Sequence, residues 1–365
     1  MTVRACYVVN AVDETSVPAD IARGLVEHTD AEVDILAWFA AEGFHGDDAV
    51  GVTCLDAPDT TTGIDRDTYR RAREFLREYD VVQAHHNHSG SFAKAIGRRL
   101  GLPVVSREGN MRRGFNRLGR VANGLTNPLA DRVVCNSRAV YDSFRRWERL
   151  ALPEAKVVFI PNGVEFDRLD AADGDGWRSA HGVDDDAVLV GTAGLLTEQK
   201  DHATLIRAVA AARSASDRPV ELAIAGDGPL EADLRETARA AGVADSVHFL
   251  GRLDRSAVYE LLDALDVYAM PSRWEGFSAA AVEAVGSGTP CVFSTIPPFV
   301  EPYEEVARFH PVGDHEALAR HLVGLAADPA ERRRLGSAGR DLVQRRYTVE
   351  RVAERYRSLY AEITD

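Results

Sequence analysis

Lysine is scarce in this sequence of 365 residues. Only three of its 43 basic residues are lysines, and its 57 acidic residues give a net charge of −14. A surface rich in hydrated carboxylates stays soluble where salt screens their mutual repulsion, so we expect a halophilic source, although a GC-rich genome would also favour arginine over lysine. The negative charge argues against nucleic acid as a partner, because phosphate backbones would be repelled.

Cysteines are few and apolar runs are short. No run reaches the 18 or more apolar residues that a membrane span needs, and the strand-like residues 5–9 lead directly into polar residues 10–16, without the apolar core of a signal peptide. We therefore expect a cytoplasmic protein. The cysteines are far apart in apolar surroundings, which indicates small, reduced, buried thiols and not a disulfide framework or a zinc site. They are Cys6, Cys54, Cys135 and Cys291.

The length and the charge distribution both divide the chain. A chain of 365 residues exceeds what one hydrophobic core usually supports, and an apolar content of 45% can fill two. Turn-forming residues gather at 161–187, so we place the break between two domains there. Residues 1–163 hold 21 basic and 22 acidic side chains (21 − 22 = −1), and residues 164–365 hold 22 and 35 (22 − 35 = −13). The excess negative charge therefore belongs to the second domain.

Short β-branched runs alternate with helical patterns along the chain, which indicates an α/β fold with parallel sheets. Two doubly wound domains follow from this alternation, and in such sheets ligands bind at the carboxyl ends of the strands. A last helix is expected at about 349–363. Strands are expected at residues 5–9, 32–38, 81–85, 104–106, 132–136, 157–160, 188–192, 220–225, 247–250, 267–269 and 291–294.

The most informative segment is residues 271–290, in which Glu275 and Glu283 lie eight positions apart around a Gly-Phe-Ser turn. Ser278 is a good N-cap for an Ala-rich helix that Gly286 ends, so the N–H groups at the helix start lack intrahelical acceptors and suit an anion. At 1.5 Å per residue, Glu283 lies about 7 to 8 Å further along the helix. Such a pair of carboxylates can hold both ends of a nucleotide sugar.

Two glutamates at this spacing also arise by chance on a solvated helix face, but the surrounding residues favour a site. The segment resembles the Glu-x7-Glu donor motif of glycosyltransferase family 4, including its Pro-Ser before, Glu-Gly-Phe within and Gly-Thr-Pro after. The resemblance implies a retaining enzyme of the GT-B fold, with two doubly wound, Rossmann-like domains that face each other across a cleft. It also implies an acceptor-side domain over residues 1–165, a nucleotide-sugar donor domain over 166–348, and a C-terminal helix over 349–365 that crosses back to the first domain.

Lys200 is the strongest candidate for a catalytic side chain, because sugar transfer builds negative charge on the leaving phosphate. Its surroundings, Ala-Gly-Leu-Leu-Thr-Glu-Gln-Lys-Asp-His, resemble the family's Gly-Arg-Leu…Lys phosphate clamp, and a surface lysine at a helix start is the alternative. After Gly194, where the family usually has an arginine, this chain has Leu195. Half of the usual cationic clamp is therefore absent, and Arg252 and Arg273 are candidate substitutes.

The resemblance also assigns roles to the carboxylates and loops of the second domain. Glu283 would accept hydrogen bonds from the ribose hydroxyls, and Glu275, the second catalytic candidate, would hold the hydroxyls of the sugar. The other donor-binding candidates are the helix start, the glycine of the clamp and the base-facing loop. They are Gly276, Phe277, Ser278, Ala279, Gly194, Arg252 and Leu253.

On the acceptor side, a His-His-Asn-His run follows the expected strand at 81–85. These histidines could be acceptor contacts, core residues or metal ligands. We expect acceptor contacts and not a metal site, because no cysteine or carboxylate completes a ligand set. The histidine that many relatives carry after the next strand is missing, and Glu108 or Asn110 can take its place. Five arginines at 107–120 form either a solvated loop or a surface for an anionic acceptor or lipid headgroups. The acceptor-binding candidates are His85, His86, Glu108, Asn110 and Arg112.

These features predict a metal-independent hexosyltransferase without a cofactor, which moves a hexose from a nucleoside-diphosphate sugar to an acceptor hydroxyl. The base, the sugar and the acceptor stay open. A lipid-linked acceptor in glycan assembly, and peripheral contact with the inner face of an anionic membrane, would fit the arginine-rich segment. Two alternatives also stay open: a catalytically silent nucleotide-sugar-binding subunit, which the missing clamp arginine favours, and a sugar-nucleotide epimerase of the same fold.

Overall fold

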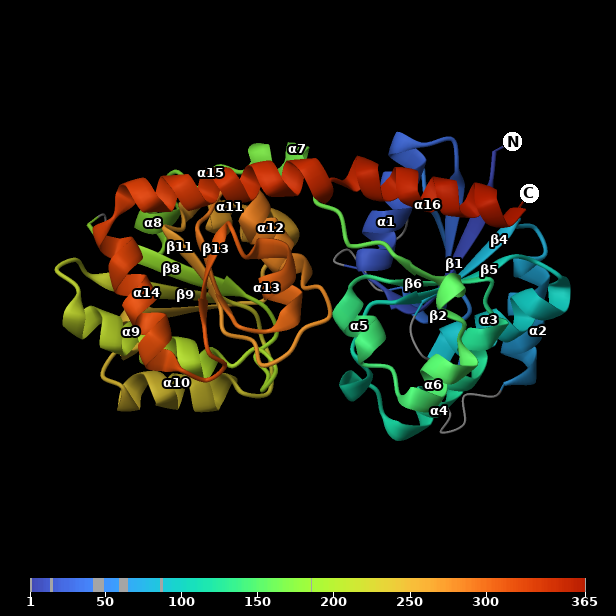
Figure 1. Ribbon diagram of the computed structural model, residues 1–365, viewed down its shortest axis with the longest axis horizontal. Coiled ribbons are helices and arrows are strands. Elements are labelled where there is room, and N and C mark those ends of the chain that lie inside the picture. Colours follow the sequence, from blue (N-terminus) through green and yellow to red (C-terminus); the bar gives the residue numbers. More distant parts are fainter. Residues whose placement is uncertain are drawn as a thin grey trace. The chain divides into compact units, whose positions relative to one another are not determined.

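The computed structural model describes residues 2–13, 16–41, 49–58, 65–85, 88–184 and 186–364. By internal contact the chain divides into two compact units. Unit 1 consists of residues 1–163 and 349–365, and unit 2 consists of residues 164–348. Each unit holds one parallel sheet with helices on both faces (Figure 1), which confirms the predicted α/β class with two doubly wound domains.

Unit 1 has a seven-stranded sheet in the order β3-β2-β1-β4-β5-β6-β7. The strands are β1 (Arg4–Val12), β2 (Glu32–Ala41), β3 (Gly51–Cys54), β4 (Val81–His85), β5 (Val104–Glu108), β6 (Arg132–Cys135) and β7 (Val157–Phe159). The helices are α1 (Val17–His28), α2 (Arg66–Leu76), α3 (His88–Leu100), α4 (Arg117–Thr126), α5 (Arg138–Asp142), α6 (Arg146–Ala151) and α16 (Val349–Thr364), with 3-10 turns η1 (Arg112–Gly114), η2 (Asn127–Leu129) and η3 (Glu154–Lys156).

Side chains of the central strand β1 alternate between two cores, because successive residues of a strand point to opposite faces. Tyr7 and Val9 pack in the core that contains α1 and α16. Cys6 and Val8 pack in the core that contains α2 and α3. Both faces of β1 are therefore buried, which explains why its sequence reads as a continuous apolar run.

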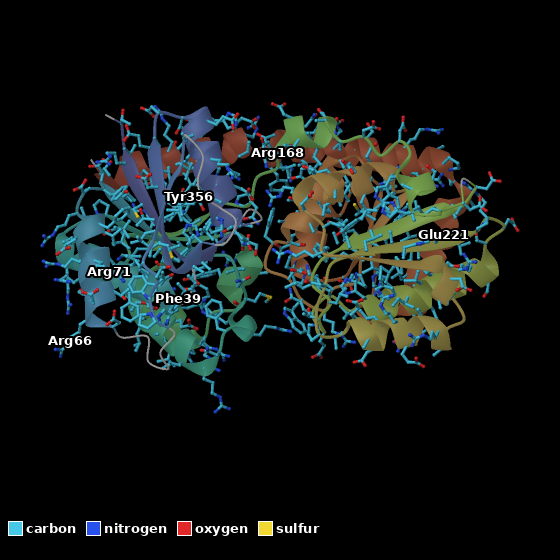
Figure 2. The ribbon with its side chains drawn as sticks, turned by 180° about the vertical axis from the view of Figure 1, so that it is seen from behind. Phe39, Arg66, Arg71, Arg168, Glu221 and Tyr356 are labelled. Carbon is cyan, nitrogen blue, oxygen red and sulfur yellow. The ribbon has the colours of Figure 1, made fainter. Side chains whose placement is uncertain are left out.

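The C-terminal helix α16 belongs to unit 1, where it packs against α1 (Figure 1). Its buried Tyr360 donates a hydrogen bond to Gln83 Oε1 (2.6 Å) and shares another with the hydroxyl of Tyr7 (2.9 Å). Tyr356, labelled in Figure 2, accepts a hydrogen bond from Arg107 Nε at 3.2 Å. Two tyrosines thus tie this helix to β1, β4 and β5.

Unit 2 has a six-stranded sheet in the order β10-β9-β8-β11-β12-β13. The strands are β8 (Val188–Ala193), β9 (Val220–Ala225), β10 (Val247–Gly251), β11 (Val267–Met270), β12 (Cys291–Ser294) and β13 (Ala307–His310). The helices are α7 (Phe166–Asp170), α8 (Trp177–Ala180), α9 (His202–Ala215), α10 (Glu231–Ala240), α11 (Arg255–Ala264), α12 (Ala279–Gly286), α13 (Pro297–Tyr303), α14 (His315–Ala327) and α15 (Pro329–Arg346), with η4 (Ala244–Ser246). One core lies with α11, α12 and α13, and the other with α9, α10 and α14.

The eleven expected strands all form, and two more were not expected. The additional strands are β3 and β13, which are four residues long and lie at the edges of their sheets. All four cysteines have free thiols, with three buried and Cys54 half-buried. No helix in the described parts of the chain combines the length and the apolar character that crossing a bilayer demands.

Candidate functional site

The candidate site lies at the carboxyl ends of β8 and β11. These strands are neighbours in the sheet, and the chain order reverses between them, since β9 and β10 follow on one side and β12 and β13 on the other. Ligands bind at such a reversal in doubly wound sheets, because the loops diverge and leave the strand ends accessible. The two loops are residues 194–201 and 271–278, which contain Lys200 and Glu275.

Lys200 and Glu275 form an ion pair between these loops. Lys200 Nζ lies 2.7 Å from Glu275 Oε1, and the two side chains are 15% and 6% exposed. Ser272 Oγ donates to the same oxygen at 2.9 Å, and Gln199 Nε2 donates to Glu275 Oε2 at 3.1 Å. Three donors therefore fix the carboxylate. Ser272 and Gln199 were not among the predicted site residues, although they adjoin the candidates Arg273 and Lys200.

Two glycines allow the loop after β8 to adopt its path. Gly194 has a φ of +154°, and a Cβ there would approach the side chain of Lys200 to 3.1 Å. At Gly226, after β9, an added Cβ would lie only 2.1 Å from the carbonyl oxygen of Gly194. Side chains at these positions would displace the loop that carries Lys200.

Both helices that start at the site have strained N-caps. Ser278 precedes α12 with a φ of +53°, and Asp201 precedes α9 with a φ of +50°. Such angles are uncommon for residues other than glycine and cost of the order of 1–3 kcal/mol each. Ser278 Oγ accepts the N–H of Ala281 at 3.3 Å, so the predicted cap is present. Strained backbone of this kind clusters at functional sites, and here it lies beside Lys200 and Glu275.

Glu283 lies on α12 and is half-buried. Tyr259 of α11 donates a hydrogen bond from its hydroxyl to Glu283 Oε1 at 3.2 Å. Phe277 is 5% exposed and its ring contacts that of Tyr347, so its side chain belongs to the core of unit 2. Gly276 precedes Phe277, and Ala279 is the first residue of α12. Glu283 is thus held in one orientation by a residue that sequence reasoning had not selected.

At the position where the family usually has the clamp arginine, this chain has an apolar side chain. Leu195 is 62% exposed, directly after Gly194. Of the two candidate substitutes, Arg273 is the one beside the lysine loop: its Nε lies 3.2 Å from Asp201 Oδ2, and its backbone N–H bonds the carbonyl of Gln199. Arg252 is exposed after β10, an edge strand separated from β8 by β9. Leu253, next to it, packs against the core.

In unit 1, the predicted acceptor residues differ in burial. His85 ends β4 and is 1% exposed, with its Nε2 3.0 Å from Gln83 Nε2 and its ring 5.0 Å from that of Tyr7. His86 lies outside the described residues. Asn110 is exposed in the loop after β5. His85 is therefore a packed residue under the helix α16, linked to Tyr360 through Gln83.

Glu108 and Arg112 belong to a buried ion-pair network. Arg112 Nη1 lies 2.7 Å from Glu108 Oε2, and Arg112 Nε lies 2.7 Å from Glu148 Oε1, with all three side chains at most 3% exposed. Asn123 and Asn127 also donate to Glu108. Burial raises the pKa of the Glu108 carboxyl, but the nearby charges of Arg112 and Lys94 and the hydrogen bonds outweigh it and lower the pKa to about 2.

Lys94 is the other charge of this network and is fully buried. Its Nζ donates to Asn123 Oδ1 and Asn127 Oδ1, each at 2.6 Å. Burial lowers the pKa of its ammonium group to about 8, although the charge of Glu108 opposes the change. Local sequence could not indicate this role, because the partners lie 29 and 33 residues away.

The structure corrects the expectation of an exposed arginine loop at 107–120 with Glu108 and Arg112 at an acceptor. Arg107 is 8% exposed and bonds Tyr356 and Asn162, and Arg112 is 3% exposed with two carboxylate partners. The oxygens of Glu108 accept from internal donors. These three charged groups therefore take their partners from inside unit 1, although Nη2 of Arg112 is buried without a hydrogen-bond partner.

Metal ligands do not gather at the site. Over the ranges that the structure describes, no three His, Cys, Asp or Glu side chains are placed to bind a metal ion together. The chemistry available at the carboxyl edge of unit 2 is a lysine, two carboxylates, and the N–H groups at the start of α12. This set suits a diphosphate joined to a sugar and a ribose.

Sequence comparison identifies both halves of the chain. Residues 16–168 match the family described as Glycosyltransferase Family 4, and residues 174–342 match the family described as Glycosyl transferases group 1. EpsF of Bacillus subtilis is 30% identical over 239 residues, which are 62% of this chain and 60% of EpsF. The phosphatidyl-myo-inositol mannosyltransferase of Mycobacterium leprae is 30% identical over 301 residues, which are 81% of this chain and 77% of that protein. The chain thus spans less than two thirds of the length of EpsF and more than two thirds of the length of the mannosyltransferase.

Solved structures share the fold at lower identity. Anabaena HepE, in a crystal structure with UDP, has a TM-score of 0.82 at 18% identity, and the match covers 99% of this chain and 100% of HepE. The sucrose-phosphate synthase of Thermosynechococcus elongatus has a TM-score of 0.80 at 19% identity, covering 99% of this chain and 98% of that one. With the matches to both halves and the mannosyltransferase, these likenesses show that the chain belongs to glycosyltransferase family 4 and has the GT-B fold.

Proposed function

We propose that the chain is a retaining glycosyltransferase that moves a hexose from a nucleoside-diphosphate sugar to an acceptor hydroxyl without a metal ion. The observation that carries the proposal is the ion pair of Lys200 and Glu275 at the strand reversal of unit 2, beside the start of α12. UDP is the favoured nucleotide, because HepE structures hold UDP and UDP-glucose. The family and the fold support a transferase.

Lys200, Glu275 and Glu283 each have a role in the proposed reaction. The bond between the anomeric carbon and the phosphate oxygen breaks, the bond to the acceptor oxygen forms on the same face, and the acceptor proton passes to the leaving phosphate. Lys200 and the N–H groups at the start of α12 stabilise the charge that grows on that phosphate. Glu275 accepts from the sugar hydroxyls, and Glu283, held by Tyr259, accepts from the ribose.

A second candidate function is nucleotide-sugar binding without transfer, which the exposed Leu195 in place of a clamp arginine favours. Turnover separates the two. Thermal unfolding with UDP, GDP and ADP would first identify the base, since a ligand at 100 times its Kd stabilises by about 2.7 kcal/mol. Release of UDP from UDP-sugars would then support transfer, whereas a binding subunit would shift the unfolding temperature and release none.

Metal independence needs its own experiment. After exhaustive EDTA treatment the protein should keep its full rate of UDP release, because Lys200 and backbone N–H groups supply the positive charge that a metal would otherwise bring. Activity that disappears with EDTA and returns only with Mn²⁺ or Mg²⁺ would contradict this part of the proposal while leaving the transferase itself in place.

A further inference from the structure

Exposed apolar side chains are concentrated in one region of unit 1. Seven large apolar side chains of the described residues are exposed, and five of them belong to α4 and α6. Three lie on α4 at the spacing i, i+3 and i+7, which places them on one helix face. The five are Leu118 (69% exposed), Val121 (49%), Leu125 (64%), Trp147 (37%) and Leu150 (77%).

The two helices present these residues as one surface. A Cβ on Gly124 of α4 would lie 2.4 Å from the ring of Trp147 and 3.0 Å from Glu148 Cγ, so α4 and α6 are in direct contact there. Figure 1 shows both helices at the same end of unit 1. We call the five exposed apolar residues the α4–α6 surface.

On α4 and α6, polar side chains are buried and apolar side chains are exposed, which is the reverse of an ordinary surface helix. The polar side chains Asn123 of α4 and Glu148 of α6 are 1% and 3% exposed. They are fixed by Lys94 and Arg112 within the buried network. Because the inward face of each helix is held by charged hydrogen bonds, the leucines and Trp147 cannot turn into the core without breaking them.

Positive charge surrounds the α4–α6 surface. Residues 111–151 contain nine arginines and three acidic residues (9 − 3 = +6), in a chain whose net charge is −14. Arg117, Arg146 and Arg149 are exposed on the same two helices. One of the three acids is Glu148, which is buried in its ion pair with Arg112. The exposed charge beside the apolar residues is thus almost entirely positive.

We propose that the α4–α6 surface docks unit 1 on an anionic lipid bilayer, with the leucines and Trp147 among the headgroups and acyl chains and the arginines on the lipid phosphates. Apolar residues flanked by arginine, with tryptophan at the boundary, match the chemistry of a bilayer interface. A second copy of the chain fits less well, because it would bring two arginine-rich surfaces together.

Vesicle binding by the full chain tests the proposal without donor or acceptor, and so independently of catalysis. Co-sedimentation with vesicles of phosphatidylglycerol and phosphatidylcholine is compared with phosphatidylcholine alone, at low and at molar salt. Arg146→Ser/Arg149→Ser should lower the partition coefficient roughly 30-fold at low salt. Leu118→Ser/Leu125→Ser should lower it about tenfold or more even at high salt, because apolar insertion is not screened.

A matched control removes the same charge elsewhere in unit 1. Arg66 and Arg73 are exposed on α2, and Arg66 points away from the body of the unit in Figure 2. Arg66→Ser/Arg73→Ser should leave vesicle binding within about twofold of wild type. Equal binding of wild type and both surface variants would overturn the proposal. It would also be overturned by a dimer, seen by sedimentation equilibrium without lipid, that Leu118→Ser/Leu125→Ser dissociates while vesicles bind none of the proteins.

Discussion

Lys200 Nζ donates a hydrogen bond of 2.7 Å to Glu275 Oε1 across 75 residues of sequence. The pair joins the loops after β8 and β11, so each residue holds the other at the strand reversal of unit 2. A lysine that is only 15% exposed and already paired is preorganised, and it can act on charge that develops nearby without first reorganising water.

Replacing Lys200 tests this preorganisation. Lys200→Ala should lower turnover by about a hundredfold or more at saturating donor, as loss of one preorganised donor does. Lys156→Ala is the control, because Lys156 lies in unit 1, where it donates to the backbone carbonyls of Pro128 and Ala130. Steady-state UDP release measures both. A Lys200→Ala enzyme within threefold of wild type would remove the lysine from the mechanism.

Glu283 and Tyr259 should differ in their effect on nucleotide binding. Glu283→Ala removes the acceptor for the ribose hydroxyls and should weaken UDP binding by about 1.5 to 3 kcal/mol, the range for hydrogen bonds to a charged group. Tyr259→Phe removes the 3.2 Å bond that orients the carboxylate and keeps the carboxylate itself, so the loss should be about 0.5 to 1.5 kcal/mol. Isothermal titration with UDP gives both values. Equal Kd for wild type and Glu283→Ala would show that the ribose binds elsewhere.

An arginine in place of Leu195 should increase activity. Leu195 is 62% exposed, so a longer side chain fits without displacing core residues. Leu195→Arg should restore the second cation of the clamp and raise kcat/KM by about tenfold, which corresponds to 1.4 kcal/mol. Leu195→Gln, similar in reach but neutral, is the control. An arginine variant no better than the glutamine variant would mean that another group, such as Arg273, already supplies the charge.

The strands could be predicted because most are buried on both faces and read as apolar runs. The two that were missed, β3 and β13, are four-residue edge strands that lack a continuous buried apolar run, and β13 follows a helix with three prolines. The donor-site candidates Lys200, Glu275 and Glu283 lie within two short segments, so local sequence was enough to propose them together. Local sequence could not show that Arg107 and Arg112 are buried, since their partners Tyr356 and Glu148 lie 249 and 36 residues away.

The acid sensitivity of unit 1 should depend on Glu108. Its pKa in the folded chain is about 2, below the ordinary value of 4.5. A folded pKa below the unfolded one means that the carboxylate contributes stability that is complete above about pH 4.5 and is lost as the pH falls toward 2. The difference corresponds to about 3 kcal/mol of unfolding free energy at neutral pH.

The difference in unfolding free energy between wild type and Glu108→Gln should therefore shrink as the pH falls. At pH 7 the variant leaves Lys94 and Arg112 with Glu148 as their one remaining carboxylate, and should lose about 3 to 5 kcal/mol. Below pH 4.5 wild type loses the stabilisation that the variant already lacks, so urea unfolding at pH 7, 4.5 and 3 should show a shrinking difference. Glu78→Gln, at an exposed position on the same unit, should stay within about 0.5 kcal/mol of wild type throughout. A gap of the same size at pH 7 and pH 3 would mean that the charge of Glu108 does not stabilise the network, and that the cost of the variant comes from its altered hydrogen bonds alone.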